Sequence, residues 1–374
     1  MKENLMPSEK ILLQCISRIL ICSFSFLLLY SCPEGSFKPD NTSDTTSHNF
    51  IWEVDTLGNF SSYLEDVTIV DENNIWAVGY LRVDDPDSSF DGTGQETFNA
   101  AHWDGEKWEL IRIVNPSPLY SVCHISDNDI WVTTFGLPIH WNGAKWKLYH
   151  IQNMGIDASA GFGIWASSPE DVWFVGYKGS IVHYDGLSFR KISTNSDTPI
   201  KDVWGINSNH VWAVSNTSSM DDEHPDGYES VVFFWDGNQL IRKYEALTGH
   251  RHDYSHTVIS GYMNTVWAFQ DTLYISSYSG LWKESISNSK GYLDHGPDKL
   301  LNGRPFLVRG TGYNDVFAFT HWGEFLHYNG RSWLQDLSVS GTIINGAAVK
   351  GNVVVLVGDL RFTRAIVFRG HHVN

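Results

Sequence analysis

The sequence predicts an all-β protein, and three features of its 374 residues support that prediction. Aromatic residues are frequent, with 16 Trp, 16 Tyr and 20 Phe, whereas charged residues make up only 18% of the chain. Several of the 32 glycines follow Asp or Asn between apolar runs, a pattern that favours tight hairpin turns. No stretch keeps a sustained 3.6-residue apolar period, so we expect helix to be a minor component.

A unit of strand, turn, strand, loop, strand, turn and strand recurs along the chain. In its first copy, residues 75–79 are I-W-A-V-G and residues 102–108 are H-W-D-G-E-K-W. The expected second-strand positions of the successive copies are Trp76, Trp131, Trp173, Trp212, Trp267, Phe317 and Val355. Spacings of this size are typical of one four-stranded blade, so the sequence predicts a seven-bladed β-propeller. Six blades with an irregular insertion remain an alternative, because residues 273–282 permit two strand registers.

The two ends of the repeat predict how the ring closes. The seventh copy ends near Gly370 without a fourth strand, and residues 50–55 (F-I-W-E-V-D) have the character of an outer strand with no blade of its own. We expect these two ends to pair within one blade, because closure would remove two exposed strand edges.

The repeat resembles that of secreted bacterial propellers built from D-V-W-A-V-G and H-Y-D-G-x-x-W units. Residues 171–176 (D-V-W-F-V-G) and 183–189 (H-Y-D-G-L-S-F) carry this resemblance. The repeat also resembles, more distantly, the Asp-box and photosystem-assembly-factor-like propellers. It covers about residues 50–374 and implies the fold. It implies no single activity, since propellers serve in binding, scaffolding and catalysis alike.

The first 31 residues are expected to be a lipoprotein signal peptide. A mildly basic start precedes an apolar run at residues 19–29, which is shorter than the 20 or so residues needed to span a bilayer. The segment Leu29-Tyr30-Ser31-Cys32 resembles the bacterial lipobox, which implies cleavage before Cys32 and lipidation of its thiol. Residues 32–49 are polar and are expected to form a flexible tether, followed by the propeller at 50–374.

These features predict an exported protein held on a bacterial membrane by its lipid. Pro33 and Glu34 stand where an aspartate would imply retention at the inner membrane, which favours the outer membrane. Of the four cysteines, Cys123 alone would remain free after processing and lipidation, so the domain is expected to fold without a disulfide. We expect a monomer.

The charge balance restricts the partners. Lys and Arg number 26 against 43 Asp and Glu, which gives a net charge of −17. A surface of this sign repels phosphate backbones, so we expect no nucleic-acid partner.

The candidate functional residues lie in loops expected to share one face of the ring. In a four-stranded blade, the loop between strands two and three and the connection to the next blade emerge on the same side, and long polar loops are the usual place for function. The candidate ligand-binding residues are Asp85, Asp87, Asp91, Asp222, His224, His252, Asp253, His256, His321 and Trp322.

Three functions are compatible with these loops. They could coordinate a cation, for which Ca²⁺ suits the oxygen-rich composition, although the EF-hand spacing is missing. They could supply the paired carboxylates of a glycosidase or polysaccharide lyase acting in the central funnel. They could also form a recognition surface for a glycan or a protein partner. We expect the last, a non-enzymatic, membrane-tethered recognition or scaffold protein without a cofactor, and keep the carbohydrate-active enzyme as the alternative.

Most tryptophans and four histidines are expected to be structural. Their recurrence at fixed repeat positions indicates packing between blades, and Trp322 alone falls at a loop position. The recurring histidines of the third strands are His102, His140, His183 and His327.

Overall fold

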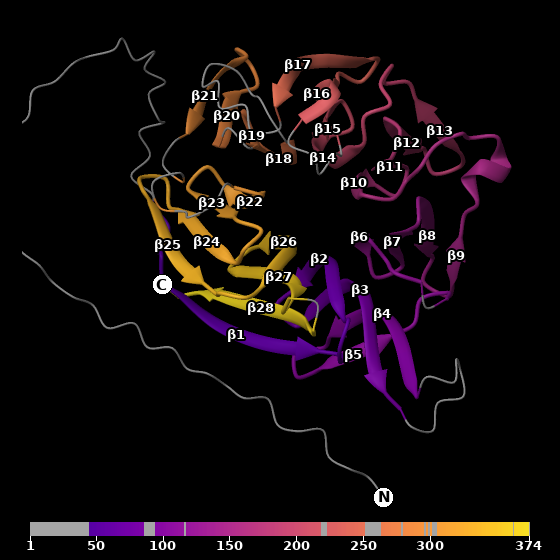
Figure 1. Cartoon of the computed structure of the whole chain (residues 1–374), viewed down its shortest axis with the longest axis vertical. Helices are drawn as coiled ribbons and strands as arrows, with labels where there is room; N and C mark the ends of the chain where they lie inside the picture. The colour runs from indigo at the N-terminus through magenta and orange to yellow at the C-terminus, as the bar shows by residue number, and fades with distance from the viewer. Residues whose placement is uncertain are drawn as a thin grey trace, which may run out of the picture.

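The computed structural model arranges the chain as a ring of seven four-stranded antiparallel sheets (Figure 1). The structure describes residues 45–85, 94–115, 117–217, 223–250, 263–277, 280–294, 297, 300, 305–361 and 363–373, with the backbone alone for 223–228 and 247–250. Within these residues, no helix has the length and apolar character to cross a bilayer. The predicted seven-bladed propeller is confirmed, and the six-blade alternative is excluded.

Each blade runs from an inner strand at the central channel to an outer strand at the rim. Blades 1 to 3 consist of β2 (Tyr63–Asp71), β3 (Asn74–Asp84), β4 (Gln95–Trp103) and β5 (Trp108–Ile111); β6 (Ser121–Ser126), β7 (Asp129–Thr134), β8 (Leu137–Trp141) and β9 (Trp146–Leu148); and β10 (Gly163–Ser168), β11 (Asp171–Gly176), β12 (Ser180–Tyr184) and β13 (Phe189–Ile192). Blades 4 and 5 consist of β14 (Ile200–Asn207), β15 (His210–Asn216), β16 (Glu223–Trp235) and β17 (Leu240–His250); and β18 (Met263–Phe269), β19 (Thr272–Ser277), β20 (Gly280–Ser285) and β21 (Lys290–Asp294). Blades 6 and 7 consist of β22 (Leu307–Gly312), β23 (Asp315–Phe319), β24 (Glu324–Tyr328) and β25 (Trp333–Ser338); and β26 (Ile343–Lys350), β27 (Val353–Asp359), β28 (Ala365–His372) and β1 (Phe50–Leu57). A short 3-10 helix (Ile151–Met154) connects blades 2 and 3.

The tight turns between third and fourth strands form as the Asp-Gly and Asn-Gly pairs predict. In blade 3, the Asp185 carboxylate accepts hydrogen bonds from the backbone amides of Leu187 and Ser188, and Gly186 adopts a φ of +88°. That φ lies in the left-handed region, which glycine enters without steric cost. An aspartate or asparagine side chain closes the same turn in blades 1, 2, 4 and 6.

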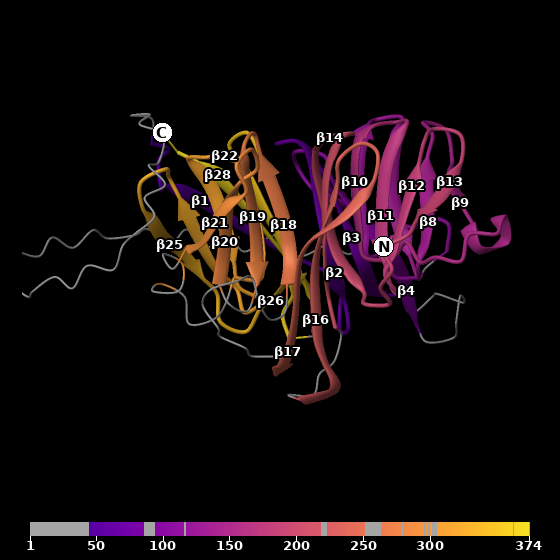
Figure 2. The same ribbon diagram turned by 90° about the horizontal axis from the view of Figure 1, so that it is seen from above.

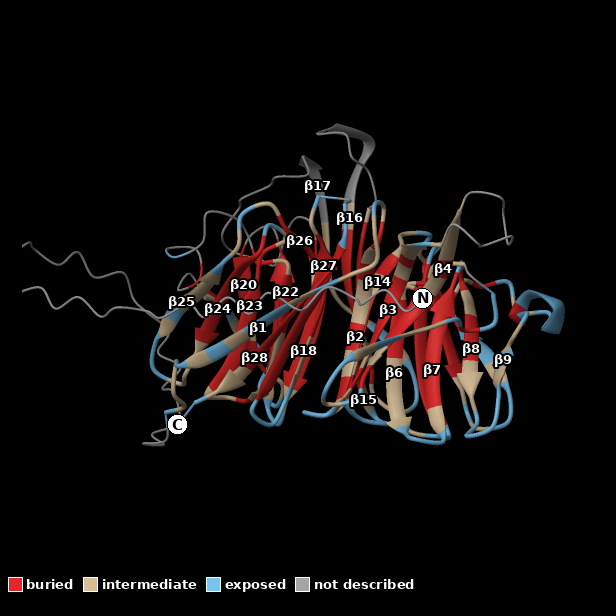
Figure 3. Ribbon diagram, turned by 90° about the horizontal axis from the view of Figure 1, so that it is seen from below, coloured by how far each residue is buried: buried red, intermediate tan, exposed pale blue. Residues whose placement is uncertain are grey.

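The core lies between the blades, where both faces of each sheet are covered (Figure 3). Trp131, Trp173 and Trp212 occupy the predicted second-strand position and are at most 1% exposed, so their packing role is confirmed. Blade 5 differs from the prediction. Trp267 lies on its first strand, opposite Tyr274 of the second strand. In sequence, the apolar run around Trp267 resembles a second strand. First strands of this ring can also carry a tryptophan, as β14 of blade 4 does at Trp204, so the residue type alone does not distinguish the two strands.

An Asp–His pair recurs in blades 2, 3 and 6, and in blade 1 Asn74 stands in the place of the aspartate beside His102. In blade 3 the Asp171 carboxylate accepts hydrogen bonds from Nε2 of His183 at 2.7 Å, from Nε1 of Trp173 at 2.8 Å and from the Ser167 hydroxyl at 2.5 Å. Burial opposes ionisation, but these hydrogen bonds outweigh it, so the pKa of Asp171 lies below its ordinary value. The pair joins the second strand to the third and holds the imidazole against the tryptophan.

The ring closes through pairing of its two ends, as the sequence predicts. β1 pairs with β28 along its full length and becomes the outer strand of blade 7. The Arg369 guanidinium of β28 lies 2.8 Å from Glu53 and 2.9 Å from Asp55 of β1, and 3.6 Å above the Trp103 ring of blade 1. One buried cation therefore joins the first strand, the last strand and the first blade.

The inner strands are joined across blades by buried carboxylates. The Asp202 carboxylate of blade 4 accepts a hydrogen bond from the Val266 amide of blade 5 at 3.0 Å. It also lies 3.1 Å from the Arg309 guanidinium of blade 6. Asp66 of blade 1 accepts the hydroxyl of Ser121 and the amide of Val122, both in blade 2. Burial raises the pKa of Asp66, although these hydrogen bonds oppose the rise.

Cys123 lies on β6 as a free thiol, and burial raises the pKa of this thiol to about 12. The thiol is therefore protonated at neutral pH and behaves as a small apolar side chain.

Candidate functional site

The connections expected to carry function do emerge on one side of the ring, which we call the loop face. They join second to third strands within blades and the fourth strand of one blade to the first of the next. Figure 2 shows β16 and β17 projecting beyond the other strands on this side. His224 was expected in a loop, but β16 begins at Glu223, which pairs with His250 of β17. His224 therefore lies on a strand that extends the blade, because the two flanking segments continue their pairing outward.

Three of the predicted ligand-binding residues have described side chains, and they lie at separate places on the loop face. Asp85 follows β3 in blade 1, and its amide donates to the carbonyl of Gly94 at 2.9 Å. His321 and Trp322 lie in the β23–β24 turn of blade 6, so blade 7 stands between them and Asp85. The structure therefore distributes these residues around the rim. Outside the described residues lie Cys32, Asp87, Asp91, Asp222, His252, Asp253 and His256.

Trp322 and His321 have different environments. The Trp322 side chain is 64% exposed, as expected of a loop residue available for contact. Nδ1 of His321 donates to the carbonyl of Ile344 at 3.2 Å, and its ring lies 5.0 Å from that of Phe306. Burial lowers the pKa of His321, so the imidazole is neutral at neutral pH. His321 therefore supports the turn that presents Trp322.

A repeated arrangement of aromatic rings lies on this face in four of the seven blades, and the sequence pattern did not reveal it. In blades 1, 2, 3 and 6, a ring at the start of the first strand contacts a ring at or near the second-to-third-strand turn. The pairs are Tyr63–Tyr80 at 6.0 Å, Tyr120–Phe135 at 5.8 Å, Phe162–Tyr177 at 4.3 Å and Phe306–His321 at 5.0 Å between ring centroids. We call these eight rings, with Phe60 and Trp322, the aromatic rim. The signal in the sequence is an aromatic residue beside or close to a glycine at the turn, as at Phe135-Gly136 and Trp322-Gly323.

The outer rings of the aromatic rim are open to solvent. Phe60, Phe135 and Tyr177 are 69%, 66% and 54% exposed, similar to Trp322. Exposed large aromatic side chains gathered on one face are typical of a binding surface, since burying them on a partner is favourable. Leu187, in the β12–β13 turn on the opposite face, is 94% exposed.

Charged groups lie inside the aromatic rim. Burial raises the pKa of Glu65 on β2 to about 7, with further contributions from the nearby carboxylates of Asp66 and Asp359. Burial and the charge of Glu65 raise the pKa of Tyr63 to about 12. Nζ of Lys201 lies 4.7 Å from the centroid of the Phe162 ring, and burial lowers the pKa of this lysine. Glu65 therefore changes its charge near neutral pH, close to the ring of Tyr63.

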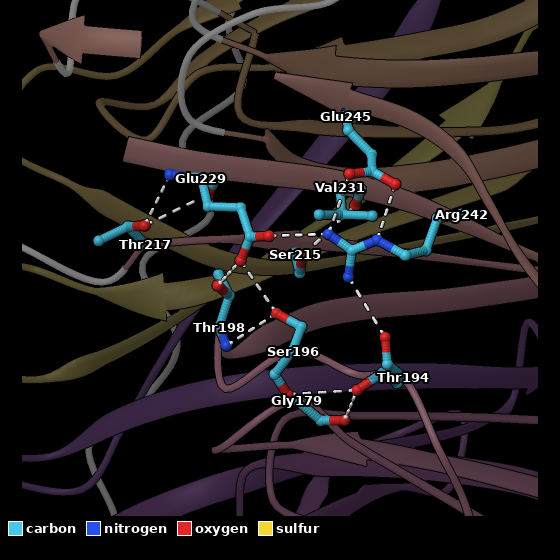
Figure 4. Close-up of polar contacts among 10 residues, drawn as sticks. All are labelled: Gly179, Thr194, Ser196, Thr198, Ser215, Thr217, Glu229, Val231, Arg242 and Glu245. Atoms are coloured by element: carbon cyan, nitrogen blue, oxygen red, sulfur yellow. Dashed lines mark hydrogen bonds and ion pairs between the residues drawn. The ribbon is translucent and has the colours of Figure 1, made fainter. Parts of the chain in front are cut away.

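A polar cluster stabilises the base of the β16–β17 projection (Figure 4). The Glu229 carboxylate accepts hydrogen bonds from Ser196 and Thr198 of the preceding connection and from the Arg242 guanidinium at 2.8 Å. Burial opposes its ionisation, but these hydrogen bonds outweigh it and lower the pKa of Glu229. Arg242 also bonds Glu245 at 2.7 Å, so both partners are already used within the protein. The cluster fixes where the projection leaves the ring.

Two pockets of about 580 and 470 Å³ lie on the opposite face, between blades 4 and 5 and between blades 2 and 3. The first contains Lys243, whose Nζ lies 2.6 Å from the buried carboxylate of Glu284. That pair is satisfied within the protein, and neither pocket touches the aromatic rim.

Solved structures similar to this chain share its architecture. They include YCF48 bound to a D1 peptide (14% identity, TM-score 0.57, covering 90% of this chain and all of the other) and YCF48 from Cyanidioschyzon merolae (12%, 0.57, 85% and 98%). The WD40 domain of Neurospora crassa Pan2 is also similar (7%, 0.53, 86% and 96%). The chain is a β-propeller. No protein-family model and no curated protein sequence matches it. The predicted resemblance to photosystem-assembly-factor-like propellers is thus confirmed for the fold.

Proposed function

We propose that this propeller is a non-enzymatic, membrane-tethered recognition scaffold that binds an extended protein segment across its aromatic rim. The observation that carries the proposal is the recurrence of ring pairs on the loop face of four blades. Aromatic side chains supply large contact areas with little loss of conformational freedom, which is why they dominate binding energy at interfaces.

The charges favour a segment with apolar and basic side chains. The chain carries a net charge of −17. Negative potential of this kind attracts cationic groups and accelerates their association. A structure of a similar propeller, YCF48, holds a bound peptide, which supports a peptide-like ligand for this chain.

Binding can be tested with a display library of 12-residue peptides selected on the full-length chain in detergent. The double variant Phe135→Ala/Tyr177→Ala should weaken the selected peptides about thirtyfold, as loss of interface anchors does. Leu187→Ala removes a comparably exposed side chain from the opposite face and should leave the affinity unchanged. Selected peptides that bind the double variant as tightly as the unaltered protein would contradict the proposal.

Two further assays test the alternatives to this proposal, a glycan ligand and a carbohydrate-active enzyme. Binding on a glycan array, combined with failure to select peptides, would show that the aromatic rim stacks on sugars and that the proposed ligand class is wrong. Glycan turnover that is lost in Asp222→Ala or His252→Ala would replace the scaffold with a carbohydrate-active enzyme. We expect neither result.

The proposal places the propeller on a membrane through lipid on Cys32, a residue outside those described. The lipobox-like Leu29-Tyr30-Ser31-Cys32 and the polar segment after it support this, and they favour the bacterial outer membrane. Cys32→Ser should abolish labelling by a fatty-acid analogue and release the protein from membranes. Membrane retention of the variant at the original level would contradict the tether.

A further inference from the structure

Four metal-ligating side chains meet where the two ends of the described chain reach blade 6. Asp315 and His327 form the recurring Asp–His pair of that blade, with Oδ1 3.1 Å from Nε2. His48, from the segment before β1, and His372, at the end of β28, lie beside them. Among the described residues, blades 2 and 3 have the same pair, as His140–Asp129 and His183–Asp171, but no additional histidine joins either of them.

The donor atoms are close enough to share one ion. Nδ1 of His48 lies 3.0 Å from Nδ1 of His327. One ligand atom from each of Asp315, His327 and His372 lies within 4.8 Å of the other two. His327 is fully buried and Asp315 is 5% exposed, so these two groups are fixed within the protein.

The surrounding hydrogen bonds orient the imidazoles toward one another. Nε2 of His327 donates to Asp315, which leaves the lone pair of its Nδ1 directed at His48. Nε2 of His48 lies 3.5 Å from the Ser332 hydroxyl, which can accept its proton and leave Nδ1 of His48 free. Two lone pairs 3.0 Å apart repel unless a proton or a metal ion lies between them. A carboxylate behind a ligating histidine is the usual second-shell arrangement of a metal site.

We propose that His48, His327 and His372 bind one divalent transition-metal ion of the Zn²⁺ class, with Asp315 orienting His327. Neutral imidazole is a preferred ligand of Zn²⁺, Co²⁺, Ni²⁺ and Cu²⁺, whereas Ca²⁺ and Mg²⁺ prefer oxygen. Nε2 of His372 donates to the carbonyl of Ser47, so its Nδ1 remains available as a ligand atom. The sequence pattern assigned His327 a structural role alone, and the two added histidines change that assignment.

Such an ion would fasten the start of the propeller to its end. His48 comes from the residues that directly precede β1, His372 ends β28, and His327 belongs to blade 6. Binding would therefore join both partners of the closing strand pair to a neighbouring blade. Because the ion binds the folded ring alone, it should stabilise the ring against unfolding.

The test uses the full chain purified in detergent and stripped of metal with a chelator. Calorimetric titration with Zn²⁺ should show one ion per chain, and Zn²⁺ but not Mg²⁺ should raise the unfolding temperature. Co²⁺ should give the visible spectrum of a nitrogen-ligated site. Strong thiolate-to-Co²⁺ absorption would instead locate the ion at cysteines and overturn the proposal.

Variants separate this site from others. His48→Ala and His372→Ala should each weaken Zn²⁺ binding at least about tenfold. His371→Ala is the matched control, since it is the neighbouring residue on β28 and its side chain points to the other face of the sheet. His48→Ala changes a residue outside the strands, so it should fold in the absence of metal. Zn²⁺ affinity equal in all three variants, or no Zn²⁺ binding by the unaltered chain, would overturn the proposal.

Discussion

Replacing Glu65 with Gln should change how the stability of the propeller depends on pH. Glu65 lies on β2 at the funnel mouth, near the carboxylates of Asp66 and Asp359, and its pKa is raised from 4.5 to about 7. Below pH 4.5 the side chain is protonated in the folded and the unfolded chain, so it contributes no difference. Between pH 4.5 and 7 the unfolded chain releases the proton while the folded chain keeps it. Above pH 7 the folded chain must hold a charge that its surroundings disfavour.

The size of the effect follows from the shift. About 2.5 pKa units correspond to at most about 3 kcal/mol of lost stability above pH 7. Glu65 is partly exposed, and water at the mouth screens the charge, so we expect about 1–2 kcal/mol. Glu65→Gln keeps the shape of the side chain and removes the charge. Its unfolding free energy, relative to the unaltered protein, should rise by that amount from pH 4.5 to pH 8.

Chemical unfolding by urea, followed by tryptophan fluorescence at pH 4.5, 6, 7 and 8, measures this difference. Glu106→Gln is the control, because Glu106 is exposed in the β4–β5 turn and the substitution makes the same change in formal charge. A stability difference between Glu65→Gln and the unaltered protein that is the same at every pH would refute the reasoning.

Three further predictions concern what holds the ring together. Arg309→Met should lower the unfolding free energy by about 3 kcal/mol, because it leaves buried Asp202 without its cation, whereas exposed Arg331→Met should change it little in the same urea titration. Asp171→Ala should cost about 3 kcal/mol in calorimetric unfolding, since two buried donors, on Trp173 and His183, and the Ser167 hydroxyl lose their acceptor; a loss below about 0.5 kcal/mol would contradict that account. Deletion of residues 50–57 should leave the β28 edge unpaired and cause aggregation on size-exclusion chromatography relative to the unaltered protein, and a deletion variant that elutes like the unaltered protein would show that closure is dispensable.

The fold could be predicted from sequence because its determinants are local and repeated. Asp185-Gly186 and its counterparts fix hairpin turns within a few residues, and tryptophans mark the second strands of blades 1 to 4. Blade 5 was misassigned at one strand because Trp267 of the first strand has the same apolar surroundings as a second-strand tryptophan. Local pattern cannot distinguish the two strands when both are buried on both faces.

The aromatic rim and the histidine cluster could not be assembled in the same way. Each ring pair joins residues about fifteen apart, and the pairs meet around one mouth only after the ring closes, as Phe162 and Tyr177 do in blade 3. His48 and His327 are 279 residues apart and become neighbours through closure alone. Attention to polar loops also favoured residues such as Asp85 over the exposed rings of the aromatic rim.

The most direct test of the recognition proposal is site-specific photo-crosslinking in living cells that produce the protein. A photoreactive amino acid replaces Tyr177 in the aromatic rim or Leu187 on the opposite face, two positions with exposed side chains on different sides of the ring. The account predicts that the Tyr177 position yields an adduct with one polypeptide, mapped by mass spectrometry to one short segment, and that the Leu187 position yields none. Equal adducts at both positions, or none at Tyr177, would contradict the claim that the loop face binds a protein segment.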